Sequence, residues 1–427
     1  NALDVGPLRD LGNGISLGVL FAFIYTIFFI APLISFLDVK IPTSTQQQVN
    51  LSRKLAIFSL SSGKTFLWTI PLICSLLILL IPLNKLEMNP TQMYSEKYTS
   101  FGPDVLWLDK KLGASFPISF KATSDNGSVS NPRFLEGLDN FSIWLEEQKE
   151  VTHVTSLART MKSLNKSMHG DDLKMKVIPE DQELSSQYLF FYEMSLPMGL
   201  DLNTSISQDR GSTRIAATLR EMTSKEYLIF DEKVTKYLRE NNLESTISKP
   251  AGFRVIFVYL MEAIVNSLLV GVTIGLALII TVIGFFFRSA SFGFLSSFPN
   301  ILPIVSAFGI WAIIDGQIDF MVAVGMGSTL GIIVDFTVHL LSKYDLARQE
   351  LKKSPEDAVL FAFEAVGFAL IAMTIILALG FSVLHLVSFL PMHNFAQFSI
   401  LAFVFALIID FFLFPNLLVR FDKRKFD

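Results

Sequence analysis

The stretch Gly325-Met-Gly-Ser-Thr-Leu-Gly-Ile-Ile-Val-Asp335-Phe-Thr-Val-His339 lies inside an apolar segment, about residues 318 to 342, that is long enough to cross a bilayer. A carboxylate at membrane depth costs roughly 2.5 to 3.5 kcal/mol on insertion scales, so such a residue usually belongs to an ion or proton pathway. We therefore expect a membrane protein, with Asp335 as its leading functional residue.

The composition is that of a chain whose solvent is largely lipid. Hydrophobic residues make up 51% of the chain and charged residues 17%, and the mean hydropathy is +0.49. A net charge of −4 argues against a nucleic-acid partner, which would require a basic stripe. The single cysteine, Cys74, lies in an apolar segment and allows neither an intrachain disulfide nor a cysteine-based metal cluster. We expect no cofactor, and the absence of a Gly-x-x-x-x-Gly-Lys-Ser/Thr loop argues against an ATP-driven pump.

Seven apolar stretches are long enough to span a membrane. They cover about residues 14–37, 66–83, 258–287, 292–314, 318–342, 358–386 and 394–419. Between the second and the third stretch, residues 84–257 have ordinary globular composition. The sequence therefore predicts seven membrane helices and one folded extramembrane domain.

The distribution of basic residues predicts the orientation. The segment from Lys40 to Lys64 and the segments after the third, fifth and last stretches carry almost all the loop Lys and Arg, and all of them fall on one side. The short alternate loops at 315–319 and 386–394 carry none. We expect the basic side to be cytoplasmic and residues 84–257 to project outward, into the periplasm of a bacterium.

The chain also contains an internal repeat. Pro7-Leu-Arg-Asp-Leu11 and the first apolar stretch match Pro391-Met-His-Asn-Phe395 and the last one, at an offset of 391 − 7 = 384. Thr26 then falls on Asp410. Because secondary transporters are commonly built from internal repeats, we infer the second half of a duplicated transporter together with the last span of its first half.

Within residues 84–257 the pattern indicates two-layer α/β packing. Residues 114–123, 151–156 and 213–220 read as strands, and residues 133–149 and 225–241 read as helices. This order favours a ferredoxin-like split βαβ unit.

Several stretches together resemble the RND (resistance-nodulation-division) superfamily, closest to its hydrophobe/amphiphile efflux branch of MmpL-like and hopanoid-exporter-like proteins. The segment from Gly331 to Tyr344 is similar to the family's helix motif around a proton-relay carboxylate, and residues 286–303 are similar to its turn between the eighth and ninth helices. Residues 168–172 and 187–202 resemble the lipid-exporter branch. The resemblance implies that the spans are the sixth to twelfth of twelve.

This resemblance divides the chain into five expected parts. They are the last transmembrane helix of the first repeat (1–39), a cytoplasmic amphipathic linker (40–65), a transmembrane helix (66–83), a periplasmic α/β porter domain (84–257), and a five-helix transmembrane bundle with a short cytoplasmic tail (258–427).

The expected proton relay centres on Asp335. Residues four apart share a helix face, so Gly331, Asp335 and His339 form one stripe, from which Thr337 is displaced. Gly331 would let a neighbouring helix approach closely, and Phe336 and Thr337 complete the motif. Asp335 also has a purely structural interpretation as a hydrogen-bonded packing residue, and His339 is either a relay or an interfacial residue.

Asp410 is the other carboxylate well inside an apolar segment. Its depth makes it a candidate for the relay, whereas Thr26 at its repeat-equivalent position shows that the pseudo-symmetry does not require the charge.

The sequence thus predicts a secondary transporter rather than an enzyme, in the bacterial inner membrane, that uses the proton motive force to export hydrophobic or amphiphilic, lipid-like molecules. The alternatives are a lipid- or sterol-sensing membrane protein without pumping and a proton-driven accessory of protein secretion. The expected partners are the substrate, the missing N-terminal half, further copies in a dimer or trimer, and periplasmic lipid carriers.

Overall fold

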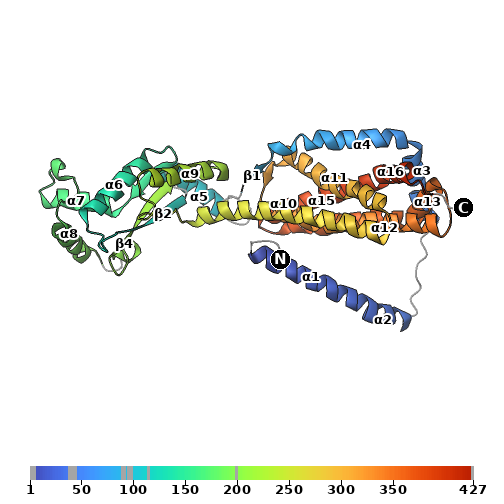
Figure 1. Cartoon of the computed structure of the whole chain (residues 1–427), viewed down its shortest axis with the longest axis horizontal. Coiled ribbons are helices and arrows are strands. Elements are labelled where there is room, and N and C mark those ends of the chain that lie inside the picture. The colour runs from blue at the N-terminus through green and yellow to red at the C-terminus, as the bar shows by residue number, and fades with distance from the viewer. Residues whose placement is uncertain are drawn as a thin grey trace. The chain divides into compact units, whose positions relative to one another are not determined.

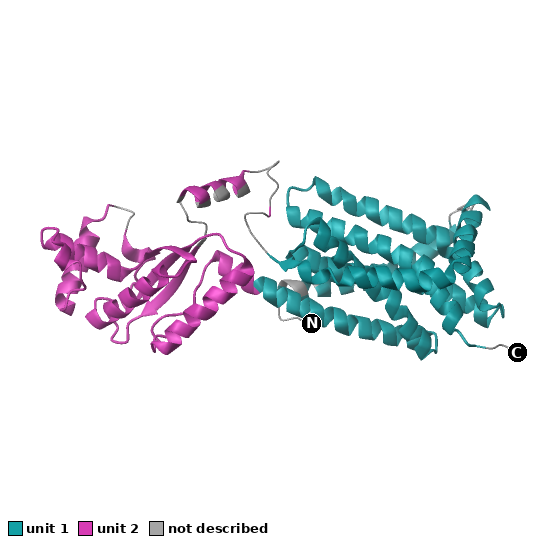
Figure 2. Cartoon of the chain, turned by 90° about the horizontal axis from the view of Figure 1, so that it is seen from above, with its two compact units in different colours: residues 1–87, 260–427 teal, residues 88–259 magenta. Residues whose placement is uncertain are grey.

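The computed structural model describes residues 6–36, 46–87, 93, 100–112, 116–197 and 201–424. The chain divides into two compact units, coloured separately in Figure 2: Asn1–Glu87 with Leu260–Asp427, and Met88–Tyr259. The unit Met88–Tyr259 contains most of the polar region between the second and the third apolar stretch.

The first unit is helical, and the described residues contain seven helices long and apolar enough to cross a membrane, as the sequence predicts. In chain order these spans are Gly12–Phe36, Gly63–Leu83, Phe253–Phe286, Ala290–Ile314, Phe320–Gln349, Pro355–Leu386 and Leu390–Phe421. Helices α4 (Gly63–Ile78), α10 (Phe253–Phe286), α11 (Ala290–Ile314) and α12 (Phe320–Gln349) account for four of them (Figure 1).

The other three spans each contain a π-helical turn. The first consists of α1 (Gly6–Tyr25), η1 (Thr26–Ile30) and α2 (Ala31–Phe36). The sixth consists of α13 (Pro355–Ala362), η6 (Phe363–Gly367), α14 (Phe368–Ser382) and η7 (Val383–Leu386). The last consists of α15 (Leu390–Ile408), η8 (Ile409–Leu413) and α16 (Phe414–Phe421). Of these turns, η1, η6 and η8 are π-helical.

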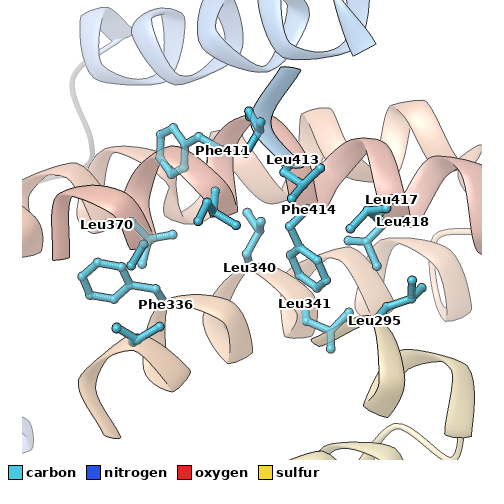
Figure 3. Close-up of a cluster of buried hydrophobic side chains, with 14 of the residues drawn as sticks. Leu295, Phe336, Leu340, Leu341, Leu370, Phe411, Leu413, Phe414, Leu417 and Leu418 are labelled. Carbon is cyan, nitrogen blue, oxygen red and sulfur yellow. The ribbon is translucent and has the colours of Figure 1, made fainter. Parts of the chain in front are cut away.

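The core of the first unit lies between α11, α12 and the last span. Figure 3 shows Leu340 and Leu341 of α12 beside Phe414 and Leu417 of α16, and all four side chains are buried. Burying a Leu or Phe side chain contributes roughly 1.5 to 3 kcal/mol, so this seam fixes α12 against the last span.

Local signals explain where the helices begin. Asp319 accepts hydrogen bonds from the amides of Met321 and Val322 and so caps α12. Ser354 caps α13, and Pro355 occupies the first helical position. The Asp319 cap fixes the start of α12, the helix that carries Asp335 and Thr337.

Helix α3 (Gln46–Ser61) lies in the linker between the first two spans. It buries the small residues Ser52, Ala56 and Ser59, while Leu51 and Phe58 are exposed. Among its larger apolar residues, Leu55 and Leu60 are partly buried against the core, and the Phe58 ring contacts that of Phe412 in η8. Ser59 accepts hydrogen bonds from Asn416 of α16, at 3.2 Å to both its carbonyl and its hydroxyl oxygen.

The second unit is an α/β unit. Its strands β2 (Phe116–Thr123), β3 (Val151–Thr155) and β4 (Ser212–Leu219) form an antiparallel sheet in the order β2-β4-β3. Its helices are α5 (Phe101–Leu112), α6 (Pro132–Glu146), α7 (Leu157–Met168), α8 (Gln182–Ser195) and α9 (Ser224–Glu240). The predicted strands and helices are all present, with ends shifted by a few residues.

One face of this sheet is buried and the other is open. Ile118 and Phe120 of β2, with Ile215 and Ala217 of β4, pack into a core with α6, α7 and α9. The segment 246–251 bridges the free edge of β2, at Ala122 to Ile247 and Ser119 to Ala251. A separate two-residue pair, β1 (Lys85–Leu86) with β5 (Gln317–Ile318), ties the end of the α4 span to the turn before α12.

Candidate functional site

Helix α12 presents one open face along the membrane span. Ser328, Gly331, Asp335 and His339, spaced three or four residues apart, are exposed, and we call them the open stripe. No described atom lies within 4 Å of a Cβ built on Gly331. The predicted stripe therefore exists, but no described helix packs closely on Gly331.

The opposite face of α12 is buried. Phe336 and Thr337 are both fully buried, and Phe336 belongs to the hydrophobic cluster of Figure 3. Thr337 follows Asp335 by two residues, which turns its side chain by about 200° at 3.6 residues per turn. The motif around Asp335 thus contributes side chains to both the exposed face and the buried face of α12.

Thr337 joins α12 to the buried carboxyl group of Asp410 in η8. Its hydroxyl lies 3.1 Å from Asp410 Oδ1 and 3.5 Å from Oδ2, and 3.4 Å from Asn300 Oδ1 of α11. Asn300 in turn donates to the carbonyl of Ser296. Asp410 is fully buried, so three spans meet at a polar contact inside an apolar bundle.

The structure does not bring the predicted relay residues into one cluster. Asp335 and His339 have no hydrogen bond or ion pair with any described residue, and Asp410 contacts Thr337 instead of Asp335. The sequence does mark each partner separately, since Asp410 is a deep carboxylate and Thr337 faces away from Asp335. The pairing itself joins positions 73 residues apart and needs the fold.

The π-helical turn η8 lies against the sixth span and the linker helix α3. Phe411 of η8 contacts Phe363 of η6, with ring centroids 4.9 Å apart. In the same turn η6, Gly367 leaves room for Ser52 of α3. A Cβ added at Gly367 would lie 3.2 Å from the Cβ of Ser52. Arg53 of α3 pairs with Glu364 of η6 at 3.4 Å, which joins the linker helix to the sixth span.

A buried ionic cluster closes the far end of α12. The carboxylate of Asp422 accepts from Tyr344 Oη, Arg348 Nε and Arg424 Nε, each at 2.9 Å. Burial alone raises the pKa of Asp422, but the hydrogen bonds from Arg424, Arg348 and Tyr344 outweigh it and lower that pKa to about 2. Asp345 binds the same Arg424 at 2.6 Å. The cluster fastens the residues after the last span to α12.

An apolar cavity of about 330 Å³ lies between α10, α11 and α12. Leu268 and Val272 of α10, Ile304 and Phe308 of α11, and Met326 of α12 are among its walls. All the residues that line it have apolar side chains, which suits a hydrocarbon group and not a polar solute. Among the described residues, no group of three or more His, Cys, Asp or Glu side chains could hold a metal ion.

Two comparisons relate this chain to known proteins. The model of the MMPL family matches residues 132–425, which is more than half of the chain. A relative from Methanocaldococcus jannaschii, described only as a membrane protein, is 29% identical over 154 residues. That match covers 36% of this chain and 39% of the relative, so the chain spans less than two fifths of the relative's length.

Proposed function

This chain belongs to the MMPL family of RND-type membrane transporters, and from that premise we propose that it exports hydrophobic or amphiphilic, lipid-like molecules at the expense of the proton motive force. The observation that carries the proposal is Asp335, an exposed carboxylate midway along a membrane span. An ionisable group in that position is expensive unless a partner segment or a water path covers it.

Asp335 is the proposed proton carrier, with His339 one turn away as the relay toward the cytoplasmic end. Both belong to the open stripe, and Gly331 leaves space for a neighbouring helix to pack against the carboxylate. That helix would come from the first repeat of the transporter, the partner that the internal repeat implies.

The proposed coupling runs through the body of α12. Protonation does work only if the two conformations bind the proton with different affinity. A rotation of α12 that moves Asp335 would also move Thr337 away from Asp410, because the two side chains project from opposite faces of one helix. Asp410 then takes part in the relay through the Thr337 contact and not by direct exchange with Asp335.

The proposed orientation places α3, α13 and α16 at the cytoplasmic end, since the basic segments of the sequence gather there. These helices contact one another in the structure (Figure 1). The chain leaves the opposite end of the bundle after α4 and returns at α10, so the unit Met88–Tyr259 would be periplasmic.

A ferredoxin-like fold of this outward unit is part of the proposal. The segment 246–251 bridges the outer edge of β2, which gives the lateral order 246–251, β2, β4, β3 for two β-α-β halves. The cavity between α10, α11 and α12 supports a substrate with a hydrocarbon part.

The decisive experiment measures proton flux and lipid movement together in proteoliposomes under an imposed pH gradient. Both should depend on the gradient and on each other in the native protein. Lipid movement that is indifferent to a protonophore would contradict a proton-driven mechanism, and lipid binding without any lipid movement would favour a sensor that does not pump.

A further inference from the structure

The open face of the outward sheet carries two cations directly opposite each other. In the antiparallel register of β2 and β4, Lys121 is the partner of Arg214, and both side chains are exposed. Cross-strand partners on one face have Cβ atoms about 4.5 to 5.5 Å apart, where like charges are unfavourable.

The hydrogen bonding makes this pair a close one. The amide of Lys121 donates to Ser248 Oγ, its carbonyl accepts from the amide of Ser248, and the amide of Arg214 donates to the carbonyl of Ser205. The two residues therefore form a pair without mutual backbone hydrogen bonds, the type in which opposing side chains approach more closely.

No described carboxylate forms an ion pair with either cation. The ion pairs of this unit join other residues, such as Lys233 with Glu150 and Arg159 with Glu146. Asp209 is an acid that the charge of Lys121 influences, and its carboxylate accepts from Ser207 Oγ and from the amide of Gly211. Those bonds, and to a smaller extent the charge of Lys121, lower the pKa of Asp209.

The two cations also share a cavity of about 370 Å³. Short polar side chains wall it, among them Asn203, Thr204 and Ser205 on one side and Ser119 and Ser248 on the other. Bridges at Ile206 to Thr213 and Ser119 to Ala251 hold these two walls against the sheet. The hydroxyl and amide groups can donate to an oxyanion that the cations attract.

We propose that this cavity binds the anionic head group of an amphiphile, with Lys121 and Arg214 sharing the charged oxygens of a phosphate, sulfate or carboxylate. An arginine fork matches such oxygens in a bidentate manner, and lysine adds a mobile point charge. The proposal rests on the proposed function for the source of the ligand, since it makes an acidic amphiphile the transported class. The pairing of Lys121 with Arg214 follows from the register of β2 and β4 and does not depend on the proposed function.

The test uses the full chain in phosphatidylcholine nanodiscs and two soluble probes, dihexanoyl phosphatidylglycerol and inorganic phosphate, titrated by calorimetry. Replacing both cations (K121Q with R214Q) should weaken binding about tenfold or more, as expected when two charge-assisted hydrogen bonds are lost. The matched control K110Q with K111Q removes the same two charges from exposed positions of α5 in the same unit and should bind as the native protein does.

Tighter binding of phosphatidylglycerol than of phosphate would assign the site to a head group, and equal binding would assign it to a soluble anion. Unchanged affinity in K121Q with R214Q, or an equal loss in the control, would overturn the proposal. A thermal melt guards against misfolding: without probe, the single variant K121Q should melt no lower than the native protein, because it relieves repulsion. Since D335N should keep the binding, loss of transport and loss of this site can be told apart.

Discussion

The hydroxyl of Thr337 lies 3.1 Å from the carboxylate of Asp410, in the interior of the bundle and on the face of α12 turned away from Asp335. One helix thus connects an open carboxylate to a buried one without a contact between the two. This arrangement allows the open stripe and the buried contact to be tested separately.

The first prediction concerns Asp335. Asp335→Asn keeps the size and polarity of the side chain but cannot release a proton, so transport should fall to the level of vesicles without protein. The variant should still elute as a folded species in size-exclusion chromatography, because the side chain is exposed and has no described partner. Undiminished transport by this variant would refute the role of Asp335.

The second prediction concerns the buried contact. Thr337→Val preserves shape but leaves the carboxyl group of Asp410 without its hydroxyl donor, which should cost about 1 to 3 kcal/mol of unfolding free energy. Thr374→Val is the matched control, since the Thr374 hydroxyl binds the Leu370 carbonyl of its own helix at 2.9 Å. Equal losses in the two variants, measured by thermal or denaturant unfolding in detergent, would mean that the Thr337–Asp410 contact adds no stability.

The third prediction is a pH dependence of stability. The pKa of Asp422 falls from an ordinary value near 3.8 to about 2 in the folded protein, so the folded state holds the ionised form more strongly than the unfolded state. The resulting stability, on the order of 2 kcal/mol, is complete above about pH 4 and is lost as the pH falls through 2. Asp422→Asn should abolish this part of the acid-induced fall in melting temperature. An unaltered pH profile would argue against the ionic cluster.

The fourth prediction tests the backbone contact between α4 and α11. A Cβ on Gly309 of α11 would collide with the Leu77 carbonyl of α4, and backbone cannot yield as a flexible side chain can. Gly309→Ala should therefore cost about 1 to 3 kcal/mol. Gly380→Ala in α14 has no described atom within 4 Å and should be neutral or gain up to about 1 kcal/mol from helix propensity. Unfolding curves of the two variants that coincide would show that α4 and α11 are not in backbone contact.

Much of the fold follows from patterns that are local in the chain. The seven spans are read from the length of apolar segments, and β2, β3 and β4 are read from alternation, because each pattern reports burial of its own element. Asp335 stands out for the same reason, as a single charge where lipid is the solvent. The residues that share a helix face with Asp335 follow from the helical period alone.

The parts that could not be predicted depend on which element packs on which. Helix α3 buries Ser52, Ala56 and Ser59 fully, whereas its larger apolar residues are exposed or only partly buried. The spacing of four and three is the small-residue pattern of close helix packing. The larger apolar residues of α3 recur at a similar helical spacing, so the sequence alone does not decide which of the two sets faces the bundle. Likewise, nothing near Asp410 in sequence specifies Thr337 as its partner, since the contact exists only once α12 and η8 pack.

The positions of the π-helical turns bear on the origin of the internal repeat. A π turn holds one residue more than the α turn around it, so it is the mark of a single-residue insertion into a helix. The turn η1 begins at Thr26 and η8 begins at Ile409, and the 384-residue offset that aligns the first and last spans brings these starts within one residue of each other. If the two spans are copies of one ancestor, the insertion is older than the gene duplication. The difference between Thr26 and Asp410 then arose after the duplication, at a turn that was already widened.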